Sequence, residues 1–298
     1  MSLRQITGRA MSFCGHDLPH QQPADATGVI GTPVGGGSPP HSCTKSAGLF
    51  QARRRTSYGH SVAHAFGARI RNRSLHAKGV KVSRLRREAH AFGVKRSGVS
   101  AANFGDAAMF SFHATKVFNT IEGGAVCFRD DSLVTVMNDL KNFGIHGPES
   151  VPDVGGNAKM NEFCAAMGIC NLRHLDSEIE KRKAAYELYM ERLSGREGIQ
   201  LNKVREGIRS NYAYFPVVFD GYKHDRNEVY DLLAEENIIA RKYFYPLTNS
   251  FECYRGKEGF DPERTPIAKH TADHVLCLPI FADITAETVN RICDIILR

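Results

Sequence analysis

The chain of 298 residues lacks features that mark several common classes of protein. No stretch approaches the roughly 18 to 20 consecutive apolar residues of a membrane-spanning helix, and the N-terminus has no compact apolar core with a cleavage site. The eight cysteines are scattered, without a CxxC pair or a zinc-finger spacing. We therefore expect a cytoplasmic protein with reduced, mostly buried thiols, no membrane partner and no metal site.

Acidic residues are nearly absent from the first part of the chain. Residues 1–87 hold only Asp17 and Asp25, so the net charge of +7 originates there and the remainder is net acidic. Residues 1–57 are also rich in Gly, Pro, Ser, His and Arg, a composition that cannot bury enough surface to offset the entropy of ordering. We expect residues 1–57 to be disordered or unrelated to the rest, and we expect no nucleic-acid partner because aromatic interleaving is missing.

From about residue 88 the sequence alternates between strand and helix patterns. Such alternation predicts an α/β fold in which helices cover a mixed sheet. The predicted strands are 104–112, 124–128, 212–219, 238–244 and 275–279, and the predicted helices are 131–143, 161–175, 176–194, 225–237, 265–274 and 285–297.

The stretch with the strongest chemical signal begins where a predicted strand ends at Ser111 and continues through Lys116 to Gly123 and Gly124. Most lysines after a strand are surface residues. Here apolar and aromatic neighbours would partly desolvate the lysine, which lowers the pKa of its amine and favours the neutral form that attacks a carbonyl. The paired glycines would let backbone pass close to a flat cofactor.

This stretch, Ser111-Phe-His-Ala-Thr-Lys116 followed by Glu122-Gly-Gly, resembles the active-site signature of the DegT/DnrJ/StrS-type sugar aminotransferases. These are pyridoxal-phosphate (PLP) enzymes of fold type I. Further matches follow in order at residues 89–93, 104–112, 155–172, 240–247 and 276–281. The resemblance covers roughly residues 88–298. It implies a mixed-sheet large domain over 58–194, incomplete at its N-terminal side, and a small C-terminal α/β domain over 195–298.

The resemblance implies transfer of an amino group from an amino acid, expected to be glutamate, to a nucleotide-linked keto-deoxy sugar. Lys116 would hold PLP and move the proton during transfer. Ser111 would bind the cofactor phosphate, although a serine at a strand end is also often satisfied by local backbone. His90 would pack on the pyridine ring, although a lone histidine is more often an ordinary surface or core residue.

The resemblance also implies a homodimer with shared active sites. Asn157 would reach across the interface toward the cofactor phosphate of the partner subunit, while its neighbouring glycines also fit a simple turn. Arg241 and Tyr245 would line the sugar-nucleotide pocket.

The sequence departs from the family at two features. The family places an aspartate three residues before the stacking histidine, where its carboxylate keeps the pyridine nitrogen protonated. Here that position is Arg87, and a cation would oppose protonation of the ring. Upstream, we find no small-residue loop opening a helix that could cradle the phosphate.

One reading of this departure is a shifted reading frame. Codons for Leu85-Arg86-Arg87 read one base later can encode Tyr-Asp, so part of residues 1–87 is hypothesised to lie outside the ancestral frame. The alternative function is then a truncated or frameshifted, inactive relic that retains dimerisation or sugar-nucleotide binding. A sugar dehydratase of the same fold is a third possibility, but those relatives replace the lysine that this chain keeps.

Overall fold

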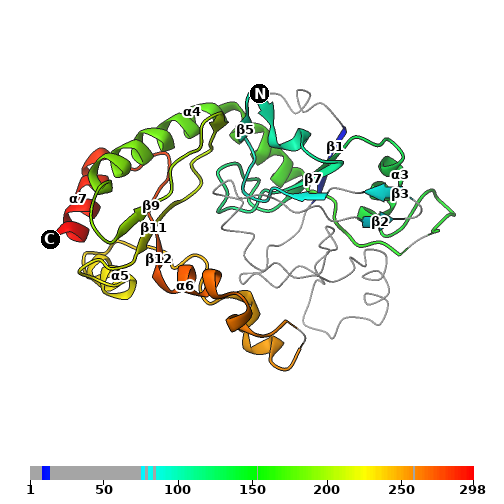
Figure 1. The fold of residues 1–298 in the computed structure, drawn as a ribbon. Helices are drawn as coiled ribbons and strands as arrows, with labels where there is room; N and C mark the ends of the chain where they lie inside the picture. Colours follow the sequence, from blue (N-terminus) through cyan, green and yellow to red (C-terminus); the bar gives the residue numbers. More distant parts are fainter. Residues whose placement is uncertain (1–8, 14–74, 78–79, 83–84, 153, 258) are drawn as a thin grey trace. The chain divides into compact units, whose positions relative to one another are not determined.

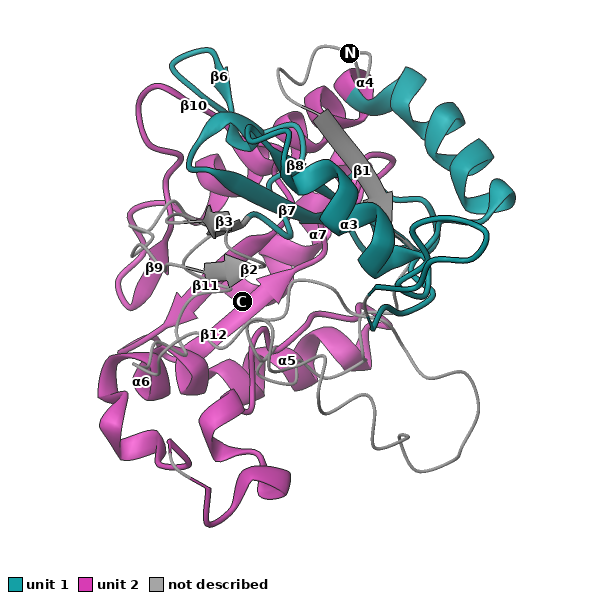
Figure 2. Ribbon diagram, turned by 90° about the vertical axis from the view of Figure 1, so that its right-hand side faces the viewer, with its two compact units in different colours: residues 1–55, 70–175 teal, residues 56–69, 176–298 magenta. Residues whose placement is uncertain are grey.

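A computed structural model describes residues 9–13, 75–77, 80–82, 85–152, 154–257 and 259–298 (Figure 1). The chain divides into two compact units (Figure 2): unit 1 comprises residues 1–55 and 70–175, and unit 2 comprises residues 56–69 and 176–298. Of residues 1–57, the structure describes a single strand, and the other residues of this segment lie outside the described part. The domain division into 58–194 and 195–298 stays a prediction.

Unit 1 contains a mixed four-stranded sheet with the strand order β1-β8-β7-β4. The central strand β8 pairs antiparallel with both β1 and β7, whereas β4 pairs parallel with β7. The sequence-based expectation of a mixed sheet is confirmed here. The strands are β1 (Arg9–Phe13), β4 (Leu85–Arg87), β7 (Ala107–Ser111) and β8 (Gly124–Phe128), and the short strands β2 (Leu75–Ala77), β3 (Val80–Val82), β5 (Lys95–Arg96) and β6 (Val99–Ser100) form two further antiparallel pairs.

The central strands of unit 1 are buried because their side chains are almost all apolar. In β8, every residue from Ala125 to Phe128 is buried. After β8 follows α3 (Leu133–Lys141), which buries Leu133, Met137 and Leu140 at the spacing of one helical face. A single 3-10 turn, η3 (Ala101–Asn103), precedes β7.

The helix α4 (Glu162–Leu193) runs from unit 1 into unit 2 without a break. The sequence pattern divided this segment into two helices at residue 175. No proline or glycine occurs between residues 169 and 193, and Leu175 and Ile179 are buried one helical turn apart, so nothing stops the helix there.

Unit 2 contains an antiparallel sheet with the order β12-β11-β9 and a core of side chains from both sheet and helices. In α7 (Ala286–Leu297), Val289, Ile292 and Ile296 form one apolar face that is fully buried. The other elements are β9 (Ile199–Leu201), β10 (Ile208–Arg209), β11 (Phe215–Phe219), α5 (Arg226–Glu235), η4 (Thr248–Ser250), η5 (Glu252–Tyr254), η6 (Pro262–Arg264), α6 (Pro266–His274) and β12 (Val275–Leu278).

The predicted strand over 238–244 is wrong. Only one bridge forms there, in which Arg241 and Cys277 exchange backbone hydrogen bonds of 3.0 and 2.8 Å. The backbone N–H of Tyr243 then donates to the carbonyl of Arg241, and that of Tyr245 to Lys242, so the chain turns away from β12. Apolar residues favour a strand, but these turns end the pairing after one residue.

Two further sequence-based expectations concern the whole described part of the chain. The described cysteines are all free, and four of them are buried, which agrees with mostly buried thiols: Cys127, Cys164, Cys277 and Cys293, against the exposed Cys170 and Cys253. Among the helices of the described residues, none combines the length and apolarity needed to cross a bilayer.

Candidate active site

Lys116 lies in the loop of residues 112–123 that joins β7 to β8, here named the lysine loop. The backbone N–H of Phe112 donates to the carbonyl of Gly123 at 2.7 Å, and that of Thr120 donates to Phe112 at 2.8 Å. Within the loop, the N–H of Lys116 donates to the carbonyl of His113 at 2.9 Å and closes a turn. The Lys116 side chain is half-buried, so its amine is held on a loop with fixed ends.

Four phenylalanines form the base of the lysine loop. Phe112 and Phe118, on either side of the lysine, are buried and meet edge to face with ring centroids 4.8 Å apart. Phe92 stacks on Phe118 at 4.5 Å and meets Phe110 and Phe112 edge to face. Aromatic pairs at these separations contribute stabilisation in addition to that from the burial of their apolar area. These contacts therefore stabilise the base of the loop. We name Phe92, Phe110, Phe112 and Phe118 the phenylalanine cluster.

A histidine and a glutamate of the same motif, to which the sequence analysis assigned no role, also stabilise the loop. The backbone N–H of Thr115 donates to Nδ1 of His113 at 3.3 Å, so Nδ1 is the acceptor and the neutral ring carries its proton on Nε2. That Nε2 lies 3.6 Å from Oε1 of Glu122. Glu122 stands directly before Gly123, so this pair connects the start of the loop to its end.

Ser111 and His90 lie on neighbouring segments of unit 1. Ser111 ends β7, and its backbone N–H donates to the carbonyl of Ala89 at 3.4 Å. The Ser111 hydroxyl accepts a long, 3.5 Å hydrogen bond from the N–H of His113. His90 is half-buried in the turn after β4, so the structure brings the His90 turn and the serine end of β7 together.

Arg87 is the last residue of β4, and it pairs with Met109 of β7 in parallel register. It therefore precedes the His90 turn directly in the strand that flanks β7. The next residue, Glu88, is buried, and its backbone N–H donates to the carbonyl of Met109 at 2.8 Å.

Asn157 is exposed and pairs with Asn142, the residue that follows α3. The segment lies tightly against α3, because a Cβ at Gly155 would come within 2.3 Å of the backbone nitrogen of Gly144. Only glycine permits that approach.

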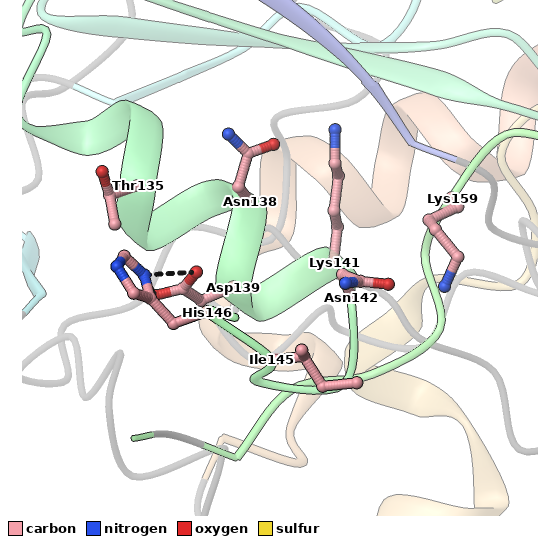
Figure 3. Close-up of a pocket in the computed structure, with 8 residues that line it drawn as sticks. All are labelled: Thr135, Asn138, Asp139, Lys141, Asn142, Ile145, His146 and Lys159. Atoms are coloured by element: carbon pink, nitrogen blue, oxygen red, sulfur yellow. Dashed lines mark hydrogen bonds and ion pairs between the residues drawn. The ribbon is translucent and has the colours of Figure 1, made fainter. Parts of the chain in front are cut away.

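A pocket of about 390 Å³ opens on this side of α3 (Figure 3). Its one carboxylate, Asp139, lies 3.3 Å from Nδ1 of His146, and the two side chains point toward each other. Two lysines, Lys141 and Lys159, line it against this single carboxylate, and the ammonium of Lys159 lies 4.1 Å from the ring centre of Phe143. Such a lining suits an anion. The pocket is formed by Thr135, Asn138, Asp139, Lys141, Asn142, Ile145, His146 and Lys159.

Arg241 and Tyr245 belong to unit 2. The other predicted site residues belong to unit 1: His90, Ser111, Lys116 and Asn157. The exposed Arg241 donates to the hydroxyl of Tyr243. The ring of Tyr245 lies 4.7 Å from the guanidinium of Arg226, which is buried and donates to the carbonyl of Ala272 at 2.9 Å. Burial lowers the pKa of the Arg226 guanidinium.

A buried cation thus lies beside the ring that is predicted to contact the substrate. It also connects the start of α5 to α6, because Arg226 opens the one helix and Ala272 belongs to the other.

Comparison with known proteins identifies the group to which this arrangement belongs. The sequence profile of the DegT/DnrJ/EryC1/StrS aminotransferase family matches residues 64–297. The chain belongs to this family. Its fold is therefore that of the fold type I aminotransferases, and PLP is the cofactor that membership in the DegT/DnrJ/EryC1/StrS family implies.

Individual relatives agree with the family match. The chain is 38% identical over 213 residues to an Escherichia coli dTDP-4-amino-4,6-dideoxy-D-glucose transaminase, covering 70% of this chain and 57% of the relative. A Shigella dysenteriae protein of the same name is 35% identical, with 70% and 56% covered. The crystal structure of DesI in the presence of its TDP-sugar product superposes with a TM-score of 0.65 at 31% identity, covering 82% of this chain and 59% of DesI. The chain thus spans a little over half the length of these relatives.

Proposed function

We propose that this chain is a PLP-dependent aminotransferase that places an amino group on the keto carbon of a nucleotide-linked deoxy sugar, with glutamate as the amino donor. The observation that carries the proposal is Lys116, half-buried on a loop whose ends are hydrogen-bonded and whose base is the phenylalanine cluster. A lysine so held presents a primary amine at a repeatable position, as covalent catalysis requires. The names of the transaminase relatives support the sugar-nucleotide substrate.

The donor groups on the described residues fit two of the three ends of PLP. The Lys116 amine suits its carbonyl carbon, and the Ser111 hydroxyl suits its phosphate. His90, in the turn beside Ser111, would offer a flat ring for the pyridine face. Arg87 does not fit the pyridine nitrogen, because a cation there disfavours the protonated ring. When bound, PLP supplies an electron sink for the reaction.

Lys116 would serve twice in the proposed reaction. Its amine would hold the cofactor and, once released, would move a proton between a carbon of the substrate and a carbon of the cofactor. The His113–Glu122 pair holds the two ends of the lysine loop together during this exchange. Arg241, with an exposed guanidinium, would bind the diphosphate of the nucleotide sugar, and Tyr245 would lie beside the nucleotide or sugar ring.

The proposed enzyme is a cytoplasmic homodimer. Apolar side chains at the start of α4 support dimerisation, because Phe163 is 87% exposed and Ile169 is 57% exposed in the single chain. Asn157, exposed beside the cationic pocket, would contact the cofactor phosphate of the partner subunit.

The proposal is tested by the visible absorbance of PLP on the purified full-length chain. PLP joined to a lysine amine absorbs at longer wavelength than amino-group-loaded cofactor, so the band should form with PLP and disappear when glutamate is added. The Lys116→Ala variant should lack the band, while the matched variant Lys203→Ala, which removes an exposed lysine, should keep it. A folded protein in which both variants behave like wild type would reject Lys116 as the cofactor lysine.

The second candidate is an inactive relic that keeps dimerisation or sugar-nucleotide binding, and Arg87 is the observation in its favour. Arg87→Asp restores the carboxylate that the family places before the histidine. If wild type shows the lysine-dependent band without turnover and Arg87→Asp gains turnover, Arg87 is the cause of inactivity. If neither protein binds PLP and both bind dTDP, the relic function is supported.

A further inference from the structure

Two histidines and one aspartate meet at the surface of unit 2. His270 and His274 lie one turn apart in α6, with ring centroids 4.2 Å apart. Asp220 directly follows β11, and its Oδ2 lies 2.9 Å from Nε2 of His270. One ligating atom from each of the three residues falls within 4.8 Å of the others.

The hydrogen bond of His274 leaves one ring nitrogen available for ligation. Nδ1 of His274 lies 2.7 Å from the carbonyl oxygen of His270 and donates to it, so the neutral ring has an unprotonated Nε2. A backbone carbonyl on the far nitrogen is the usual arrangement for a histidine that binds metal through the near one. The three residues thus supply two imidazole nitrogens and one carboxylate oxygen.

The surroundings suit a cation. His274 is the last residue of α6, and the C-terminal end of a helix carries a partial negative charge. The His270 and Asp220 side chains are 54% and 38% exposed, so an ion can enter and water can complete its coordination. Two ligands of a tetrahedral zinc ion lie roughly 3.4 Å apart. Asp220 and His270 therefore need to separate by about half an ångström, and the ligating atom of His274 lies within 4.8 Å of both.

We propose that Asp220, His270 and His274 form a binding site for a divalent transition-metal ion of the zinc class, with water in the remaining position. Two imidazoles and a carboxylate favour Zn²⁺, Co²⁺ or Ni²⁺ over Mg²⁺ or Ca²⁺, which prefer oxygen ligands. The bound ion connects the end of β11 to the end of α6, two segments that are 50 residues apart in sequence. The site is structural and independent of the proposed aminotransferase chemistry.

The test uses the full-length chain without a polyhistidine tag, stripped of metal with a chelator and titrated with Co²⁺ and then Zn²⁺. Co²⁺ should give the visible absorbance of a four-coordinate ion, and Zn²⁺ should displace it. The double variant His270→Ala/His274→Ala and the single variant Asp220→Asn should each weaken Co²⁺ binding at least about tenfold, since loss of even an outer-sphere partner costs 10- to 100-fold. His224→Ala, which removes another histidine of unit 2, should leave this binding unchanged.

A variant that should gain an absorbance signal distinguishes a change at the metal site from misfolding. His274→Cys replaces one ligand by another, so Co²⁺ should still bind and should acquire the strong near-ultraviolet absorbance of a thiolate–cobalt bond. The proposal is overturned if the double variant binds Co²⁺ as tightly as wild type. It is equally overturned if His274→Cys binds Co²⁺ without the thiolate signal.

Discussion

The ring of Phe92 stacks on that of Phe118, with centroids 4.5 Å apart and an angle of 28° between the planes. Phe92 follows the His90 turn and Phe118 follows Lys116 by two residues, so this contact joins the two segments that carry predicted cofactor ligands. We expect the folding of the site to depend on it.

Phe118→Ala removes the buried ring of the phenylalanine cluster that contacts both Phe92 and Phe112. The expected loss in free energy of unfolding is about 3 to 5 kcal/mol, because a large buried ring leaves a cavity. Phe118→Leu keeps most of the volume and should cost less. Urea denaturation of the three proteins checks the order, and equal stability of wild type and Phe118→Ala would contradict the packing described here.

Gly168 of α4 lies against Thr120 of the lysine loop, since an added Cβ would come within 2.7 Å of the Thr120 methyl carbon. Gly168→Ala alone should destabilise the chain, because overpacking costs about 1 to 3 kcal/mol and exceeds the helix-propensity gain of about 1 kcal/mol. Thr120→Ser removes that methyl and keeps the hydroxyl that donates to the carbonyl of Glu122 at 2.7 Å.

In the Thr120→Ser background, Gly168→Ala should therefore change sign and stabilise the chain. Thermal unfolding of all four proteins measures the cycle. Additive effects of the two substitutions would show that the methyl group and the new Cβ do not meet.

Asp225 caps the start of α5, accepting hydrogen bonds from the backbone N–H groups of Asn227 and Glu228, while the Glu228 side chain accepts from the N–H of Asp225. The hydrogen bond from the Glu228 N–H lowers the pKa of the Asp225 carboxyl. Asp225→Ala should cost about 1 kcal/mol.

The stabilisation that this cap provides should decrease at low pH. Its charge-dependent stabilisation is complete above the unfolded pKa of about 3.9 and is lost as the pH falls through the lowered folded value. Asp225→Asn keeps a capping oxygen without the titration, so its stability should fall less between pH 5 and pH 3. Parallel curves for wild type and Asp225→Asn would argue against the ionised cap.

Because the thiol of Cys277 is buried, we expect the free energy of unfolding to decrease at alkaline pH. Burial raises the pKa of this thiol to about 12, so the folded chain keeps a proton that the unfolded chain releases near pH 9. The stabilisation is complete below pH 9 and is lost as the pH rises toward 12, at roughly 1 kcal/mol per pH unit. Cys277→Ala should show a shallower decline in this range, whereas Cys170→Ala, which removes an exposed thiol, should follow wild type.

Local patterns account for the part of the fold and site that the sequence predicted. The hairpin of β7 and β8 and the position of Lys116 between them follow from two apolar runs with a glycine pair at the second. The strand predicted over 238–244 failed because turns at Tyr243 and Tyr245 end its pairing with β12 after Arg241, and the apolar pattern does not reveal these turns. The roles of the predicted site residues stay predictions.

Side-chain pairings beyond a few residues were the contacts that sequence reasoning missed. His113 and Glu122 approach each other only because β7 and β8 return the chain on itself. His270 and Asp220 meet because α6 packs beside the end of β11. The sequence contains two histidines four residues apart, His270 and His274, but it does not indicate that Asp220 lies beside them, since no local rule connects residue 220 to α6.

The exposed side chains at the start of α4 also make the rate of thiol modification a measure of association between chains. Phe163, Met167 and Cys170 are exposed and follow one another at the spacing of a single helical face. If two chains associate through this face, a thiol reagent reaches Cys170 only during the time that a chain spends apart from its partner. The rate of Cys170 modification would then fall as protein concentration rises, while Cys253, exposed in unit 2, sets the rate for an unshielded thiol.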